Sequence, residues 1–241
     1  SLIKSLPLIA STFRDSMKAL AGGQGGSELR TDKNISMKMV VICLAVLIVL
    51  TGVLPQVPVG IGGAVLIAIF GFFFAAVSSR MVGIVGSSNN PVSGMAIATL
   101  LFSTIILKAT GAEGAAGMKA AIAIGTVICI VAAIAGDTSQ DLKTGYLVGA
   151  TPIKQQYGEI IGTIVSAIAI GGVLYLLDAA WGFGSEQLGA PQATLMKMIV
   201  EGVMGGKLPW SLVIVGVVLA CVVEILGIPV LPFAIGVYLP V

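Results

Sequence analysis

Five apolar runs, each close to the length that crosses a lipid bilayer, constrain this chain more than any other feature. A helix needs about 20 largely apolar residues to span the hydrocarbon layer. The runs comprise residues 37–54, 60–78, 118–135, 158–177 and 210–226. Only 10% of the 241 residues are charged and 57% are hydrophobic, whereas soluble domains carry roughly 25% charged residues. We therefore expect an all-α, polytopic transmembrane helical bundle, an integral multi-pass protein whose partner is the lipid bilayer.

Residues 1–36 differ from the rest of the chain because they carry charged side chains and a glycine-rich stretch. This composition suits a short interfacial helix with a flexible linker, or the tail of a spanning helix. We divide the chain into a cytoplasmic or interfacial arm with its linker, 1–36, and a transmembrane transporter domain, 37–241. The chain begins at Ser1 and ends at Val241 within an apolar, proline-containing segment, so we expect a domain that is incomplete at both ends.

The distribution of basic residues predicts the orientation in the membrane. If every apolar segment crosses, nine of the 13 Lys and Arg residues fall on the side of the arm and four on the other side. Positive charges concentrate on the cytoplasmic side of membrane proteins. We therefore place the arm in the cytoplasm and the loop 178–209 outside, with Trp181 and Trp210 as interfacial anchors near its ends.

Residues 81–107 consist of two apolar stretches separated by a polar run, and neither stretch is long enough to span the bilayer alone. The charge distribution favours a crossing here. Two interpretations stay open: a loop followed by a short helix, or a discontinuous or re-entrant segment with its polar break inside the membrane. Irregular backbone at that depth is tolerated only within protein or beside a water-filled cavity, and broken helices of this kind form many transporter sites.

A second polar run, 136–146, directly follows an apolar segment and is predicted to be a solvated loop or a second interruption of the membrane domain. Asp137 and Asp141 are four residues apart, so they share a face if the turn is helical. Lys143 is close enough in sequence to neutralise one of them. This run therefore concentrates the scarce charge of the membrane domain at one place.

A weak internal repeat links the two polar runs. The frame Ser, four residues, Ser or Thr, then Gly occurs in 88–94 and again in 139–145, and each copy follows a hydrophobic segment. Thr138 and Ser139 are residue types that could cap a short helix in the second copy. Paired interruptions at corresponding positions indicate a transporter binding site, so both runs are candidates for contact with a substrate.

The stretch 136–147, Gly-Asp-Thr-Ser-Gln-Asp-Leu-Lys-Thr-Gly-Tyr-Leu, resembles the polar D-x-x-Q-D-[FL]-K-T-G-Y-L block of the oligopeptide transporter (OPT) superfamily. Segments 78–83, 87–91 and 151–156 are similar to its prokaryotic branch, which is related to the yellow stripe-like metal-chelate transporters. The resemblance covers most of the chain, which would be an internal to C-terminal portion of a family member. It implies an all-helical secondary transporter that couples import of peptides or metal–chelate complexes to protons, here in a prokaryotic cytoplasmic (inner) membrane.

Two motifs of the fungal and plant peptide branch of this superfamily are absent from the chain. The Asn-Pro-Gly motif is not matched, because Asn90 and Pro91 are followed by Val92, and no Lys-Ile-Pro-Pro-Arg motif occurs. The substrate class implied by the resemblance therefore stays open between oligopeptides and metal chelates.

Candidate substrate-contacting residues come from the two polar runs, where hydroxyl and amide groups can hydrogen-bond peptide amides or chelate carboxylates and a lysine can hold an anionic group. They are Ser87, Ser88, Asn89, Asn90, Ser93, Thr138, Ser139, Gln140, Lys143, Thr144 and Tyr146. Candidate proton carriers are carboxylates in or beside the apolar runs, where an ionisable group normally faces a cavity or a partner. They are Asp137, Asp141, Glu159 and Glu224. Pairing with a nearby lysine or backbone donor at the interface is the alternative for the last two.

The absence of histidine excludes several kinds of chemistry. Neither Ser-His-Asp catalysis nor a His-ligated metal is available. The three cysteines lie in apolar runs without CxxC spacing, and the chain has no nucleotide-binding motif and no basic stripe for nucleic acid. We therefore expect no enzyme, cofactor, metal site or nucleic-acid partner, and we leave open whether the protein pairs with a second copy.

Two other functions are alternatives to a proton-coupled transporter. A passive channel would give uptake that ignores the proton gradient. An intramembrane aspartyl protease of the presenilin type carries Gly-x-Gly-Asp, but Ile134 replaces the first glycine in the segment 134–137 and no earlier span holds an Asp. The proton-coupled transporter remains the leading expectation.

Overall fold

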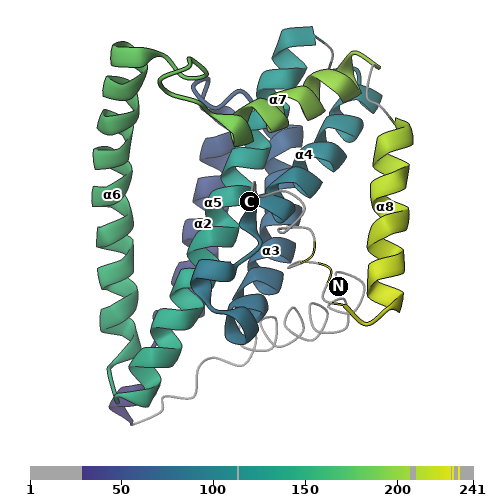
Figure 1. Cartoon of the computed structure of the whole chain (residues 1–241). Coiled ribbons are helices and arrows are strands. Elements are labelled where there is room, and N and C mark those ends of the chain that lie inside the picture. The colour runs from purple at the N-terminus through teal and green to yellow at the C-terminus, as the bar shows by residue number, and fades with distance from the viewer. Residues whose placement is uncertain (1–28, 113, 207–209, 229, 231–232, 234–241) are drawn as a thin grey trace.

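The computed structural model describes residues 29–112, 114–206, 210–228, 230 and 233 (Figure 1). The interfacial helix and glycine-rich linker expected in the arm therefore fall almost wholly outside the described residues. The arm contributes a short described segment, residues 29–36, that leads into the first long helix. We call the end of the molecule where this segment lies the arm end.

Every regular element in the described part of the chain is a helix. The elements are η1 (Arg30–Asp32), α2 (Met37–Val53), α3 (Gly60–Val85), η2 (Ser87–Asn89), α4 (Val92–Ala109), α5 (Gly114–Leu147), α6 (Pro152–Trp181), α7 (Pro191–Met204) and α8 (Trp210–Ile225). The helices α2 to α6 are long and apolar enough to cross a membrane, and α8 is a shorter apolar helix. The expected all-α, polytopic membrane architecture is confirmed.

Successive long helices run in alternating directions (Figure 1). The helix α2 leads away from the arm end, α3 returns to it, and α4, α5 and α6 continue the alternation. The break between α3 and α4 lies at the arm end, and α4 runs from it to α7 at the opposite end, where the Lys108 ammonium donates to the Val203 carbonyl at 2.8 Å. Residues 81–107 therefore divide into the last turns of α3, the η2 break and a helix α4 that is long and apolar enough to cross a membrane.

The core consists of α3, α4 and α5, packed through small residues. In α5 the side chains of Ala121, Ile124, Ile128 and Ala132 are fully buried at intervals of three or four residues, which is the spacing of one helix face. Leu100 of α4 packs against α5 where a glycine leaves room: a Cβ at Gly125 would lie 2.6 Å from the Leu100 Cγ. Close approach at small residues is the usual packing device of membrane helices.

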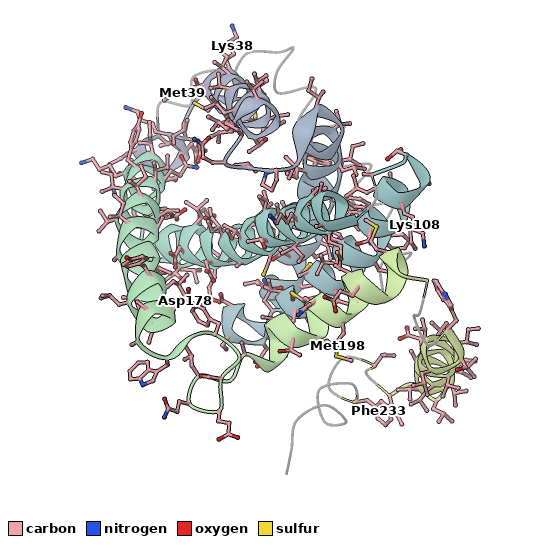
Figure 2. The ribbon with its side chains drawn as sticks, turned by 90° about the horizontal axis from the view of Figure 1, so that it is seen from above. Lys38, Met39, Lys108, Asp178, Met198 and Phe233 are labelled. Atoms are coloured by element: carbon pink, nitrogen blue, oxygen red, sulfur yellow. The ribbon has the colours of Figure 1, made fainter. Side chains whose placement is uncertain are left out.

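By contrast, α2 and α6 contact the core at one end each. No residue in the apolar window of either helix is buried. The helix α2 meets α3 away from the arm end, where a Cβ at Gly52 would lie 3.2 Å from the Ala64 Cβ. In Figures 1 and 2, α6 stands at one margin of the molecule, on the opposite side of the core from α8.

Two expectations about elements were wrong. The run 136–146 is neither a loop nor a second interruption, because α5 continues through it for 34 residues without a break. Thr138 and Ser139 therefore lie inside a helix and cap nothing. The loop 178–209 contains α7, which lies across the end of the molecule opposite the arm end (Figure 1). Its apolar residues pack against the core: Val200 is fully buried.

Candidate functional site

The η2 break docks on α5 through side chains that both polar runs supply. The Ser87 amide donates to the Gln140 Oε1 at 2.7 Å, and the Ser87 hydroxyl donates to the Asp137 carboxylate. The apolar run of α5 ends at residue 135, two residues before Asp137. The break therefore lies at the arm-side edge of the apolar part of the bundle, in a polar layer shared with α5.

Asn90, at the end of the break, inserts between α3 and α5. Its amide donates to the Ser78 hydroxyl at 2.7 Å and to the Ala132 carbonyl at 3.4 Å, and the Ser78 hydroxyl also donates to Ala132. Gly136 makes this possible, because a Cβ there would lie 2.6 Å from the Asn90 Nδ2 and 2.8 Å from a methyl group of Val82. The buried Asn90 Oδ1 has no hydrogen-bond partner among the described residues.

Ser79 and Ser139 join α3 and α5 beside this contact. The Ser79 hydroxyl donates to the Ala135 carbonyl at 3.1 Å, and the Ser139 hydroxyl donates to the Ser79 carbonyl at 3.2 Å. Each of these side chains gains a partner on the neighbouring helix, which a solvated loop would not provide. The polar residues of 136–146 therefore support a continuous α5 instead of interrupting it.

The third side of the polar layer is the contact between α5 and α6. The Thr138 hydroxyl donates to the Glu159 Oε2 at 2.8 Å, and the Gln155 amide donates to the Asp141 carbonyl at 3.1 Å. The Gln155 amide fills the space left by Gly145, where a Cβ would collide with it. The second oxygen of Glu159 and the Gln155 Oε1 are buried, and neither has a hydrogen-bond partner among the described residues.

Three further polar residues, in η2 and at the start of α4, face outward. The side chains of Ser88, Asn89 and Ser93 are exposed at this end of the bundle. They are therefore accessible to a solute that approaches the polar layer from the arm end.

The last turns of α5 also present exposed polar side chains. They belong to Asp141, Lys143, Thr144 and Tyr146. The Lys143 ammonium lies 5.1 Å from the centre of the Tyr146 ring. The Thr144 hydroxyl donates to the Gln140 carbonyl of its own helix at 3.0 Å.

Glu224 does not belong to the polar layer. It is exposed near the end of α8, which lies across the core from α6 (Figures 1 and 2). Of the four candidate proton carriers, the structure brings together Asp137, Asp141 and Glu159. No group of three or more His, Cys, Asp or Glu residues within the described ranges could hold a metal ion.

Sequence reasoning missed several members of the polar layer. The register of α3 and α6 against α5 is needed to find them, and they are Ser78, Ser79, Gln155, Gly136 and Gly145. A usable signal was present: two small residues nine positions apart flank the charged turns of one helix. The arrangement as a whole offers exposed hydroxyl, amide and ammonium groups around a carboxylate that is partly withdrawn from water.

Comparison with known proteins relates the chain to one family. The model of the OPT oligopeptide transporter protein family matches residues 3–241. A Haemophilus influenzae protein named as a candidate oligopeptide transporter is 34% identical, and the match covers 99% of this chain and 44% of that protein. A Saccharomyces cerevisiae protein named in the same way is 31% identical over 70% of this chain and 22% of its own length.

The chain thus spans less than half the length of these two relatives. No solved structure matches it significantly. The family model covers nearly the whole sequence, including both polar runs and all the long helices. The chain belongs to the OPT oligopeptide transporter family.

Proposed function

We propose that the protein is a secondary active transporter that imports oligopeptides or metal–chelate complexes across a prokaryotic cytoplasmic membrane and couples this import to protons. The observation that carries the proposal is Glu159, a carboxylate in the same layer as the η2 break whose buried Oε1 has no donor among the described residues. An ionisable group at the edge of a membrane span is costly unless it has a function or a partner. The names of the relatives agree with transport of peptides.

Substrate contact is assigned to the exposed polar groups around η2 and the last turns of α5. Ser88, Asn89 and Ser93 offer hydroxyl and amide groups to peptide amides or chelate carboxylates, and Lys143 offers a positive charge to an anionic group. Ser87, Asn90 and Gln140 are already engaged in holding the break against the core. Their role is to fix the position of the exposed residues.

Proton coupling is assigned to Glu159, with Asp137 and Asp141 as the other candidates. A protonated Glu159 carries an O–H group on an oxygen that now lacks a donor. Gln155, one helical turn away on the same face of α6, presents a second buried acceptor that has no donor in the described part of the chain. Protonation thus changes the hydrogen bonding of the α5–α6 contact, which is how a proton can bias the position of α6.

The test is uptake by the protein reconstituted in liposomes with an imposed pH gradient. Labelled di- to tetrapeptides and a metal–chelate complex are supplied in turn, each in competition with the other class. Glu159→Gln is expected to abolish the acceleration by the gradient, and Asp137→Asn or Asp141→Asn reports whether a second carboxylate contributes. Glu186→Gln, in the exposed loop after α6, is the control that keeps the acceleration.

Two results would contradict the proposal. Full coupling of uptake to the gradient in all three carboxylate variants would show that these carboxylates of the polar layer do not carry the proton. Uptake that ignores the gradient in the unmodified protein would instead favour a passive channel. Size-exclusion chromatography of each variant in detergent separates a loss of coupling from a loss of folding.

A further inference from the structure

Among the described residues, the helix α6 contacts the rest of the molecule only at its base. Every side chain from Ile160 to Leu176 is exposed, whereas Gln155 and Glu159 contact α5. In Figure 1 the two helices meet at the arm end and diverge away from it. A long helix with contacts at one end can change its tilt without unpacking a core.

The described part of the arm makes a second contact with this base. The Arg30 guanidinium donates to the Thr151 hydroxyl at 2.9 Å and to the Gly149 carbonyl at 2.8 Å. The Asn34 Oδ1 accepts from the Gln156 amide at 3.4 Å. These bonds join segments about 120 residues apart, and we call this contact, residues 30–35 against 149–156, the clasp.

The clasp also completes the first turn of α6. The first amides of a helix have no partner within the helix, and the Thr151 side chain makes no capping bond. The Lys33 carbonyl accepts from the Ile153 amide at 2.9 Å, so the arm caps α6. In turn the Gln156 Oε1 accepts from the Ile35 amide at 2.9 Å, which ties the start of α2 to the same helix.

The hydrogen bonds of the clasp differ in chemistry from the contacts of the core. The bonds of Arg30 and Asn34 are exposed, so water can replace each partner when they separate, and the net loss per bond is small. The connection beside it turns at Gly149, which has a φ of +72°. The core contacts of α5 with α3 and α4, in contrast, bury apolar side chains such as Leu100 and Ile128 that would have to enter a new environment.

We propose that the clasp is a latch: it holds α6 at its base in the state described here, and it opens when α6 tilts during transport. The proposal rests on the proposed transport function, but it does not depend on the substrate class or on which carboxylate carries the proton. The proposal gives the arm a role in the transport cycle, in addition to the roles proposed for the polar layer.

The test locks the latch after the protein has folded. In a background in which Cys43, Cys129 and Cys221 are replaced by Ala, the pair Asn34→Cys and Gln156→Cys is joined by a short, reducible thiol cross-linker. Uptake in liposomes is expected to fall at least tenfold on cross-linking and to return on reduction. Equal uptake before and after cross-linking would overturn the proposal.

A matched control joins two helices away from the clasp. In the same background Gly52→Cys and Ala64→Cys bring two Cβ atoms within about the separation that a disulfide needs. Oxidation of this pair is expected to leave uptake unchanged. If oxidation of the control lowers uptake as much as the clasp cross-link does, any restraint stops transport and the latch is overturned.

A second measurement does not require transport. Ile153→Cys keeps the capped amide, and its labelling by a maleimide from the arm side reports opening of the clasp. Arg30→Gln removes two of the clasp bonds and is expected to raise the labelling rate about tenfold, and an unchanged rate would contradict the latch. Absence of gradient-driven uptake in the reduced protein would overturn the proposed function instead. In that case the labelling rate of Ile153→Cys still tests whether the clasp opens.

Discussion

At the scale of single residues, the polar layer depends on glycines that let neighbouring helices approach. Gly136→Ala is expected to destabilise the protein, because the new Cβ meets the Asn90 amide at 2.6 Å and Val82 at 2.8 Å, both held by packing. Overpacking of this kind costs about 1–3 kcal/mol, read as a lower unfolding temperature in detergent. Gly83→Ala, in open space on α3, is the control and should leave the temperature unchanged or raise it.

The hydroxyl of Thr138 has a partner that a sequence cannot identify. It donates to Glu159 on another helix at 2.8 Å, so Thr138→Val is expected to lower gradient-driven uptake several-fold, whereas Thr138→Ser should retain it. Thr126→Val is matched to it, since the exposed Thr126 hydroxyl donates only to the Ile122 carbonyl of its own helix. Equal uptake by the Thr138→Val and Thr126→Val variants would remove Thr138 from the coupling path.

At the scale of elements, hydrophobicity located four of the long helices but not their ends. It was wrong for α4, which is long and apolar enough to cross although both halves of 81–107 were predicted to be too short, and for 210–226, where α8 is shorter than a span. The prediction for 37–54 matches α2 (Met37–Val53), because the apolar run and the helix end together before Pro55. The run 118–135 ends twelve residues before α5 does. The extra turns are polar and are stabilised by hydrogen bonds to α3, η2 and α6, which depend on tertiary register and not on local composition.

The same reason explains which part of the candidate site was predictable. The polar runs were found because hydroxyl, amide and charged residues are scarce in this chain, and the structure does place 87–90 against 137–140. The inserted Asn90 and the bond from Thr138 to Glu159 required the depth and rotation of three helices. The helix α7 was missed because it lies in a segment whose apolar residues are too few to span.

The packing of α4 on α5 gives a prediction for a pair of elements. Gly125→Ala places a Cβ 2.6 Å from the Leu100 Cγ in the middle of the core, so the two helices must separate or Leu100 must repack. We expect about 1–3 kcal/mol of destabilisation, measured as a lower midpoint of thermal unfolding. Gly162→Ala on exposed α6, which meets nothing within 4 Å, should not lower the midpoint; if it does so equally, tight packing at Gly125 is not the cause.

At the scale of the whole molecule, basic residues lie at the two ends of the helical bundle. Arg30, Lys33, Lys143 and Lys154 lie on elements that meet at the arm end, and Lys108 and Lys197 lie on elements at the opposite end. The basic residues at the arm end belong to the larger group that the sequence assigns to the side of the arm, and positive charge favours the cytoplasmic side. Because the helices alternate in direction, the two ends of the bundle lie on opposite sides of the membrane, and labelling from one side can show which end faces the cytoplasm.

The prediction is that the arm end faces the cytoplasm. In the background without native cysteines, Val148→Cys reports the arm end and Glu186→Cys reports the loop beyond α6, and both positions are exposed. A membrane-impermeant maleimide added to intact cells is expected to label Glu186→Cys but not Val148→Cys, and permeabilised cells should be labelled at both. The reverse pattern would place the polar layer and the clasp outside and would contradict the prediction.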